Sequence, residues 1–242
     1  AFKRAVRDLE FDVAELAIVT FLMAKAYGKP LVLVPAVLIG RFQHQFLVYN
    51  AGRGPLAPGD LAGRRVGIRA YSVTTAAWLR GILANDHGVD IDRVKWVTFE
   101  DPHVAEYRDP PNAKRAPEGK DPVSMLLAGE LDAAVVADSA AKDPRLKTLI
   151  PDPAAAARDW HRRNGALQIN HMLVVKASLS KSDPLAVREV YRLLLESKKL
   201  AGLPAGTGID SNPFGVEANR RNLEVAIDYV VQQRLTPERF RV

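Results

Sequence analysis

The chain contains 242 residues, of which 48% are hydrophobic, and its 34 Lys and Arg side chains outnumber its 28 Asp and Glu side chains. This length and apolar share suffice for a sizeable core in one large domain or two lobes, and the basic balance favours acidic ligands. Because the basic residues are scattered and cysteine is absent, we expect no nucleic-acid-binding surface, no disulfide and no thiolate metal site.

The first fifty residues consist of short apolar segments in which helix and strand patterns alternate. The apolar residues between Phe2 and Leu9 follow the i, i+3, i+4, i+7 spacing of one helix face. Gly28, with Pro30 two residues later, is typical of a helix end. We predict helices over 2–9 and 18–27 and strands over 11–16, 31–35 and 45–50.

The middle of the chain continues this alternation after a turn-rich connection that holds three glycines and two prolines between residues 50 and 60. Asp121 followed by Pro122 is typical of a helix start, because Asp caps the first turn and proline fits its first position. A polar, proline-rich stretch over 109–120 predicts a loop. The predicted elements are strands over 65–69, 94–99 and 131–137 and helices over 74–84 and 121–129.

The last third predicts a strand over 169–176, a helix from Asp183 to about 200, a Gly/Pro-rich loop over 202–213 and a helix over 216–233. Strands that alternate with helices predict an α/β fold with mainly parallel sheets. The predicted strands 45–50 and 169–176 bracket a middle segment with strands and helices of its own. We therefore predict two lobes, 1–47 plus 174–242 and 48–173, with a ligand cleft between them.

Metal binding and membrane insertion are not predicted. The five histidines show no metal-ligand spacing. The longest apolar runs, over 18–24 and 31–40, are shorter than the roughly 20 residues that a membrane-spanning helix needs. No secretory signal is visible, which favours a cytoplasmic location, and a periplasmic location stays open if a signal peptide precedes Ala1.

A candidate anion site lies where a predicted strand ends and a predicted helix begins, at Ser72, Thr74 and Thr75. The first N–H groups of a helix lack internal partners and carry partial positive charge, so such a junction can hold an anion. Arg69 lies beside it and could bind a carboxylate with two hydrogen bonds, and Tyr71 could stack on an aromatic ring. The structural alternatives are a simple helix cap, a solvated arginine and a tyrosine that covers a hinge.

Further candidates lie in strands and at the predicted crossings between the lobes. Glu15 interrupts an apolar strand and either faces a ligand or forms an ion pair. His171, next to Asn170 in a predicted strand, faces either a ligand or the core. The same alternatives apply to His44, which follows Arg41 at the first crossing.

Seven segments, spread over most of the chain, carry the pattern of one known family. They are FDVAEL (11–16), GRFQHQFLVYN (40–50), DLAGRRVGI (60–68), AYSVTTAAWLRGIL (70–83), DPVSMLLAGELDAAVVA (121–137), INHMLVV (169–175) and FGVEANRRNLEVAIDYV (214–230). With these segments the chain resembles the 4,5-dihydroxyphthalate decarboxylase-like family, which shares the type 2 periplasmic-binding fold with transporter solute receptors. The W-L-R-G-I-L, R-F-x-H and N-R-R-x-L-E motifs are the more specific ones, whereas D-L-x-G-x-x-V-G-I is generic to the fold.

The resemblance implies a two-lobed fold in which a further strand and helix precede residue 11, so the chain is expected to lack the N-terminal portion of that fold. It also implies decarboxylation of an aromatic acid without an organic cofactor. Substrate carboxylates would dock at 72–75 and on Arg69 or Arg41, and His171 or His44 would protonate the ring carbon that loses carbon dioxide. Glu15 is the third candidate catalytic residue. Histidine suits this task because its ordinary pKa lies near the working pH.

The alternative is a non-catalytic solute-binding protein of an ABC-type transporter or a sensor. Decarboxylase-type members tend to carry E-Y-Q-M-T where this chain has A-Y-S-V-T at 70–74, and this departure favours the alternative. The lack of a visible export signal favours the enzyme. The expected partner is a small carboxylate ligand; a homo-oligomer stays open, and the alternative adds a transporter permease.

Overall fold

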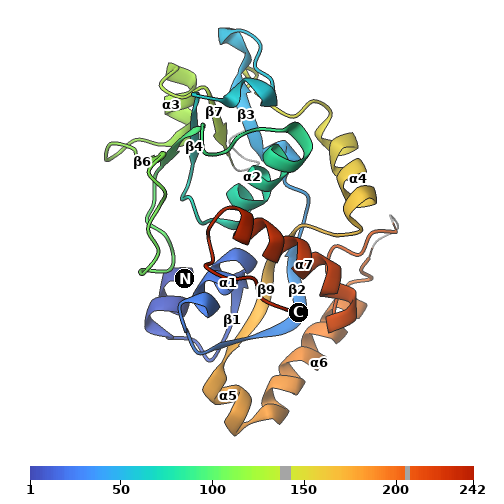
Figure 1. Cartoon of the computed structure of the whole chain (residues 1–242). Helices are drawn as coiled ribbons and strands as arrows, with labels where there is room; N and C mark the ends of the chain where they lie inside the picture. Colours follow the sequence, from blue (N-terminus) through green and yellow to red (C-terminus); the bar gives the residue numbers. More distant parts are fainter. Residues whose placement is uncertain (137–142, 205–207) are drawn as a thin grey trace. The chain divides into compact units, whose positions relative to one another are not determined.

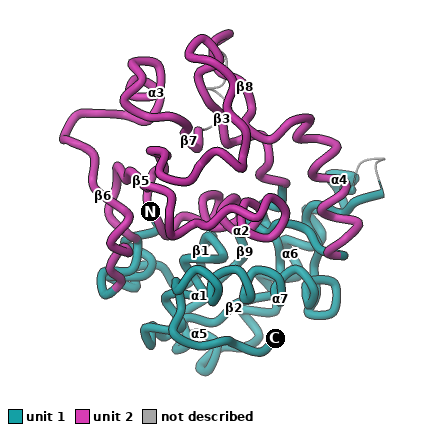
Figure 2. The backbone as a smooth tube through the Cα atoms, turned by 45° about the horizontal axis from the view of Figure 1, so that its top comes forward, with its two compact units in different colours: residues 1–41, 103–106, 165–242 teal, residues 42–102, 107–164 magenta. Residues whose placement is uncertain are grey.

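The computed structural model describes residues 1–136, 143–204 and 208–242 (Figure 1). The chain divides into two compact units (Figure 2). Unit 1 comprises residues 1–41, 103–106 and 165–242, and unit 2 comprises residues 42–102 and 107–164. In the lobes predicted from the sequence, the boundaries lie after residues 47 and 173.

Unit 1 contains a three-stranded antiparallel sheet in which the last strand of the chain lies in the middle, in the order β1-β9-β2. Its strands are β1 (Val13–Ala17), β2 (Leu31–Gly40) and β9 (Ile169–Lys176). Its helices are the π-helix η1 (Arg4–Asp8), α1 (Ile18–Ala26), α5 (Ala177–Ser182), α6 (Pro184–Leu200) and α7 (Val216–Gln232).

Helices cover this sheet and bury its apolar side chains. α1 and α7 lie over the face that is turned to the viewer in Figure 1. Val34, Leu173 and Val175 form a buried cluster, and apolar residues of α6, among them Val190 and Leu194, pack against it. The central strand β9 is therefore held by strands on both edges, and its odd-numbered residues extend toward one face of the sheet.

Unit 2 contains a mixed six-stranded sheet in the order β6-β5-β4-β7-β3-β8. Pairing is parallel from β6 to β7 and antiparallel from β7 to β8. The strands are β3 (Leu47–Asn50), β4 (Arg65–Ile68), β5 (Lys95–Thr98), β6 (Ala113–Arg115), β7 (Ala133–Val135) and β8 (Leu146–Thr148). The helices are α2 (Thr74–His87), α3 (Pro122–Ala128) and α4 (Pro153–Asn164), with short 3-10 turns η2 (His44–Phe46), η3 (Ala51–Arg53) and η4 (Pro58–Leu61).

The predicted α/β class is confirmed, and the expected parallel pairing is found along β6-β5-β4-β7. The sheet of unit 1 differs from the expectation because β9 returns from unit 2 and runs between β1 and β2 in the opposite direction. A helix that follows a strand predicts a parallel crossover only when the next strand pairs with the first. In unit 1, β9 lies between β1 and β2, so these two strands do not pair with each other.

Element bounds agree closely in β9 and α6, and less well elsewhere. β6 lies inside the stretch expected to be a loop, and α4 was not predicted. α4 begins with the same Asp-Pro signal as α3 and α6: the Asp152 carboxylate accepts a hydrogen bond from the Ala155 N–H (3.0 Å). Ala137, the end of a predicted strand, and residues 205–207 of the predicted Gly/Pro-rich loop lie outside the described residues.

Candidate functional site

Glu15 and His171 meet on one face of the sheet of unit 1. In the antiparallel register Ala17 lies opposite His171, so Glu15, two residues earlier, is the diagonal neighbour of His171 on the same face. The Glu15 Oε1 atom contacts the His171 Nδ1 atom. Ala17 is small and leaves space for the imidazole ring. The side chains are 43% and 21% exposed, so a solute has access to the pair.

This contact determines what His171 can do chemically. A carboxylate only accepts hydrogen bonds, so Nδ1 carries the proton in the contact and Nε2 is the ring nitrogen left for another partner. A carboxylate that holds one imidazole nitrogen while the other meets a substrate is an arrangement for proton transfer. Of the two alternatives for Glu15, an ion-pair partner or a ligand-facing group, the geometry supports a partner of His171.

An aromatic side chain links His171 to a second histidine. Phe2 presents its ring edge-on to His171, with centroids 5.1 Å apart, and to His103, with centroids 5.6 Å apart. His103 Nδ1 lies 2.9 Å from the Thr20 hydroxyl, and the His103 carbonyl accepts a hydrogen bond from Arg7 Nε (2.9 Å). Neither Phe2 nor His103 was a candidate. Sequence patterns place His103 in a charged loop, for which a solvated turn is the simpler interpretation.

Asn170 and Arg41 also belong to unit 1, but they are not part of this pair. Asn170 is 5% exposed and, as the residue before His171 on β9, extends toward the other face of the sheet. Arg41 is exposed, and its N–H donates to the Gln168 carbonyl (3.2 Å). Just before it, Gly40 packs so tightly that a Cβ atom would lie 2.2 Å from the Ser211 carbonyl oxygen.

In unit 2 the predicted anion site forms the start of α2. Ser72 and Thr74 are each 3% exposed, and Thr75 is partly buried. The N-cap residue is Val73, which has no hydroxyl and makes no side-chain capping hydrogen bond. The structural alternative, a hydroxyl group at the N-cap, is therefore not realised. The side chain of the N-cap residue thus does not cap α2, and the N-terminus of a helix attracts anions.

Arg69 and Tyr71 flank this turn in different environments. Arg69 is exposed, and its Nε atom lies 4.0 Å from Glu100 Oε2, a long and solvated contact. Tyr71 is 2% exposed, and the Arg80 guanidinium lies over its ring, 3.8 Å from the centroid. Arg80 Nη2 also donates to the Tyr71 carbonyl (2.7 Å). One face of the Tyr71 ring is thus already occupied by a cation.

His44 lies at the start of η2 in unit 2 and is 1% exposed. Burial, reinforced by the nearby positive charges of His87 and Arg163, lowers the pKa of His44 to about 4. Its ring packs near Phe42, which in turn contacts Trp160 and His161 edge-on. A histidine that is neutral at pH 7 cannot serve as an imidazolium acid, so this environment argues against His44 as the proton donor.

Two further properties concern the described residues only. Among residues 1–136, 143–204 and 208–242, no group of three or more His, Asp or Glu side chains is arranged to hold a metal ion. Within the same residues, no helix combines the length and the apolar character that crossing a bilayer requires.

Two relatives of known name match the chain. Over 174 residues it is 32% identical to 4,5-dihydroxyphthalate decarboxylase of Pseudomonas putida, covering 66% of this chain and 67% of that protein. The chain belongs to the 4,5-dihydroxyphthalate decarboxylase family. The enzyme of the same name from Comamonas testosteroni is 30% identical over 213 residues, which cover 83% of this chain and 64% of the relative. The matches thus span about two thirds of each family member's length, and no family model matches the sequence.

The fold of this family member is found among solved structures. The alkanesulfonate-binding protein SsuA of Xanthomonas axonopodis pv. citri, solved with bound MOPS, superimposes with a TM-score of 0.62 at 17% identity. The match covers 98% of this chain and 80% of that protein. The predicted type 2 periplasmic-binding fold is confirmed, and at this identity the likeness concerns the fold alone.

Proposed function

We propose that this family member binds a small aromatic dicarboxylate and decarboxylates it, with His171 as the general acid. The contact between Glu15 and His171 carries the proposal. Of the two candidate histidines, His171 is the one whose ring is oriented by a carboxylate and is accessible. The names of the two relatives support 4,5-dihydroxyphthalate as the substrate.

The reaction replaces a carboxylate on the ring by a proton. A ring hydroxyl para to the departing carboxylate donates electron density to the carbon that bears it. His171 in its protonated form delivers the Nε2 proton to that carbon. The bond to the carboxylate then breaks, carbon dioxide leaves, and the electron pair of that bond restores the aromatic ring. Glu15 accepts the Nδ1–H throughout and keeps Nε2 directed at the substrate.

The second carboxylate needs a cationic or N–H-rich partner. At the start of α2, which carries Ser72, Thr74 and Thr75, the N-cap residue Val73 makes no side-chain cap hydrogen bond, and the exposed guanidinium of Arg69 makes a long contact to Glu100. It stays a prediction that the ligand of His171 also contacts Arg41, Asn170 and the start of α2.

The test is carbon dioxide release from 4,5-dihydroxyphthalate. We expect the His171→Gln variant to lose about 10²–10⁴ in kcat while KM changes little, because the proton donor acts in the transition state. Glu15→Gln is expected to lose less, since an amide oxygen can still accept from Nδ1. Glu10→Gln is the matched control, because Glu10 pairs with the exposed Arg4 in the same unit.

A wild-type chain that binds 4,5-dihydroxyphthalate without releasing carbon dioxide would contradict the proposal and favour a solute-binding protein. Equal kcat in wild type and His171→Gln would remove His171 from the mechanism even if the reaction occurs. A loss in Glu10→Gln as large as that in Glu15→Gln would show that the effect is general destabilisation.

A further inference from the structure

Two contacts within unit 1 hold the imidazole ring of His171. Glu15 Oε1 contacts its Nδ1 atom, and this one hydrogen bond fixes the direction of a single ring atom while the plane of the ring can still turn. The second contact is aromatic. The Phe2 ring meets the His171 ring edge-on, with centroids 5.1 Å apart and an angle of 84° between the planes. Edge-to-face packing is a preferred geometry of aromatic pairs, so this contact favours one orientation of the His171 plane.

Phe2 is itself packed against an anchored residue of the same unit, His103. Their ring planes meet at 81°, with centroids 5.6 Å apart. The His103 side chain is buried, and its Nδ1 atom lies 2.9 Å from the hydroxyl of Thr20, a buried residue of α1. Arg7 Nε donates to the His103 carbonyl oxygen (2.9 Å). His103 is thus held through its side chain and its backbone, and it supports the Phe2 ring.

We propose that Phe2 is a positioning residue for His171. It holds the imidazole plane, so that Nδ1 stays on Glu15 and Nε2 keeps its direction. The inference rests on the proposed function, in which Nε2 of His171 delivers the proton to the substrate. Proton transfer depends strongly on geometry, because a displacement of about 1 Å can lower the rate by about 10². Without the Phe2 ring, the imidazole can turn by 180° and offer Nε2 to Glu15 instead.

The kinetic test is carbon dioxide release from 4,5-dihydroxyphthalate by wild type, Phe2→Leu and Phe2→Tyr. Phe2→Leu should lower kcat about tenfold while KM stays close to that of wild type, because a misdirected donor affects proton transfer more than substrate binding. Phe2→Tyr keeps the ring and should retain most of kcat. Phe11→Leu is the matched control, because Phe11 is also partly buried in unit 1 but its ring contacts Arg4, at 5.3 Å from the guanidinium carbon to the ring centroid. It should keep the kcat of wild type.

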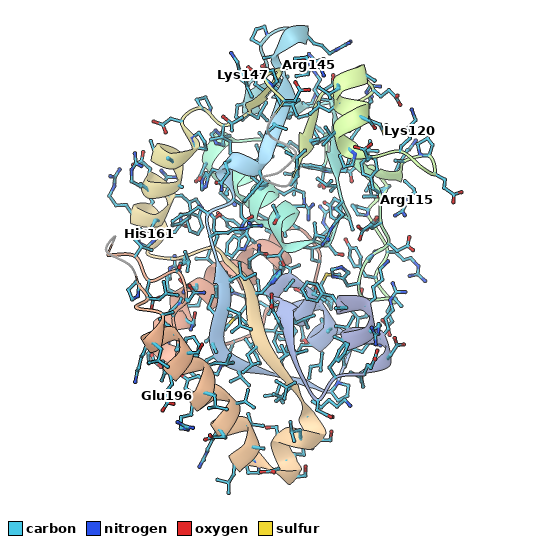
Figure 3. All side chains as sticks on the ribbon, turned by 180° about the vertical axis from the view of Figure 1, so that it is seen from behind. Arg115, Lys120, Arg145, Lys147, His161 and Glu196 are labelled. Carbon is cyan, nitrogen blue, oxygen red and sulfur yellow. The ribbon has the colours of Figure 1, made fainter. Side chains whose placement is uncertain are left out.

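A spectroscopic test needs no turnover. The ring-nitrogen NMR shifts of His171 report which nitrogen carries the proton, and they are recorded at pH 9, where an ordinary histidine is neutral. We expect a proton on Nδ1 in wild type and a mixture of the two tautomers in Phe2→Leu. His161 on α4 (Figure 3) is the internal reference, because its ring also meets a phenylalanine edge-on, Phe42 at 5.8 Å, and its shifts should not change.

The two tests separate this inference from the proposed function. If no chain releases carbon dioxide but Phe2→Leu gives the tautomer mixture, the positioning contact stands and only the proposed function fails. Unchanged His171 shifts in Phe2→Leu overturn the inference whatever kcat does, and an equal fall of kcat in Phe11→Leu overturns it as general destabilisation. If Phe2→Leu does not fold, the wild-type chain decides: nuclear Overhauser effects between the ring protons of Phe2 and His171 support the contact, and their absence refutes it.

Discussion

The burial of His44 predicts how stability depends on pH. Above pH 6.5 this histidine is neutral in the folded and the unfolded chain, so its titration contributes nothing. As the pH falls below 6.5, the unfolded chain takes up a proton that the folded chain refuses until about pH 4. Protonation therefore stabilises the unfolded chain, and the free energy of unfolding falls across this interval.

The size of the effect follows from the same two pKa values. At about 1.4 kcal/mol per pH unit, the interval from 6.5 to about 4 corresponds to about 3 kcal/mol of unfolding free energy, of which about 2 kcal/mol falls between pH 7.5 and pH 5. His87 adds to the slope with the same sign, because burial lowers its pKa as well. Asp109 acts with the opposite sign at lower pH, because burial raises its pKa.

The assay is urea denaturation of wild type and His44→Gln at pH 7.5, 6 and 5, with His161→Gln as the control. We expect wild type and control to lose stability in parallel. The His44→Gln variant should lose about 2 kcal/mol less between pH 7.5 and pH 5, which isolates the contribution of His44 from that of His87. Equal slopes in all three chains would refute the argument that this imidazole is buried in the neutral form.

Two further predictions concern the folded chain. Gly40→Ala should lower the free energy of unfolding by about 1–3 kcal/mol, because the added Cβ would meet the Ser211 carbonyl oxygen at 2.2 Å and Leu167 Cδ2 at 2.7 Å; urea denaturation measures this, and an unchanged midpoint would contradict it. Asp121→Ala should cost about 1 kcal/mol, because the carboxylate accepts from the Val123 and Ser124 N–H groups at the start of α3. Asp121→Asn, which still accepts these bonds, should lose less in the same assay.

Local structure was predictable where the residues of a segment themselves indicate a helix or a strand and where it begins. β9 coincides with the predicted strand, whose residues are mostly apolar. α6 begins as predicted because Asp183 caps its first turn, and it ends at Leu200 with Lys198 and Lys199 in its last turn, where the helix dipole favours positive charge. α4 was missed because its average character is polar, although Asp152 offers the same capping signal. Strand direction in unit 1 was not predictable, since no local pattern states that β9 pairs with both β1 and β2.

The same limit applies to the candidate site. Glu15 and His171 were each identifiable as polar interruptions of apolar strands, but their contact depends on the register that sets Ala17 opposite His171. Phe2 could not be connected with either histidine from its place in a helical pattern. For His44 the residue type and position were noted, whereas its burial, which decides its protonation state, depends on the surrounding fold.

The order of strands in unit 1 has a consequence for biosynthesis. β1 and β2 leave the ribosome before β9, and the place between them stays empty until β9 has been made, after all of unit 2. Pairing over such long sequence distances is slow, and the half-built sheet exposes unpaired strand edges in the meantime. Glu15 therefore has no contact with His171 until unit 2 has been made, and a nascent chain released before residue 171 lacks this contact altogether.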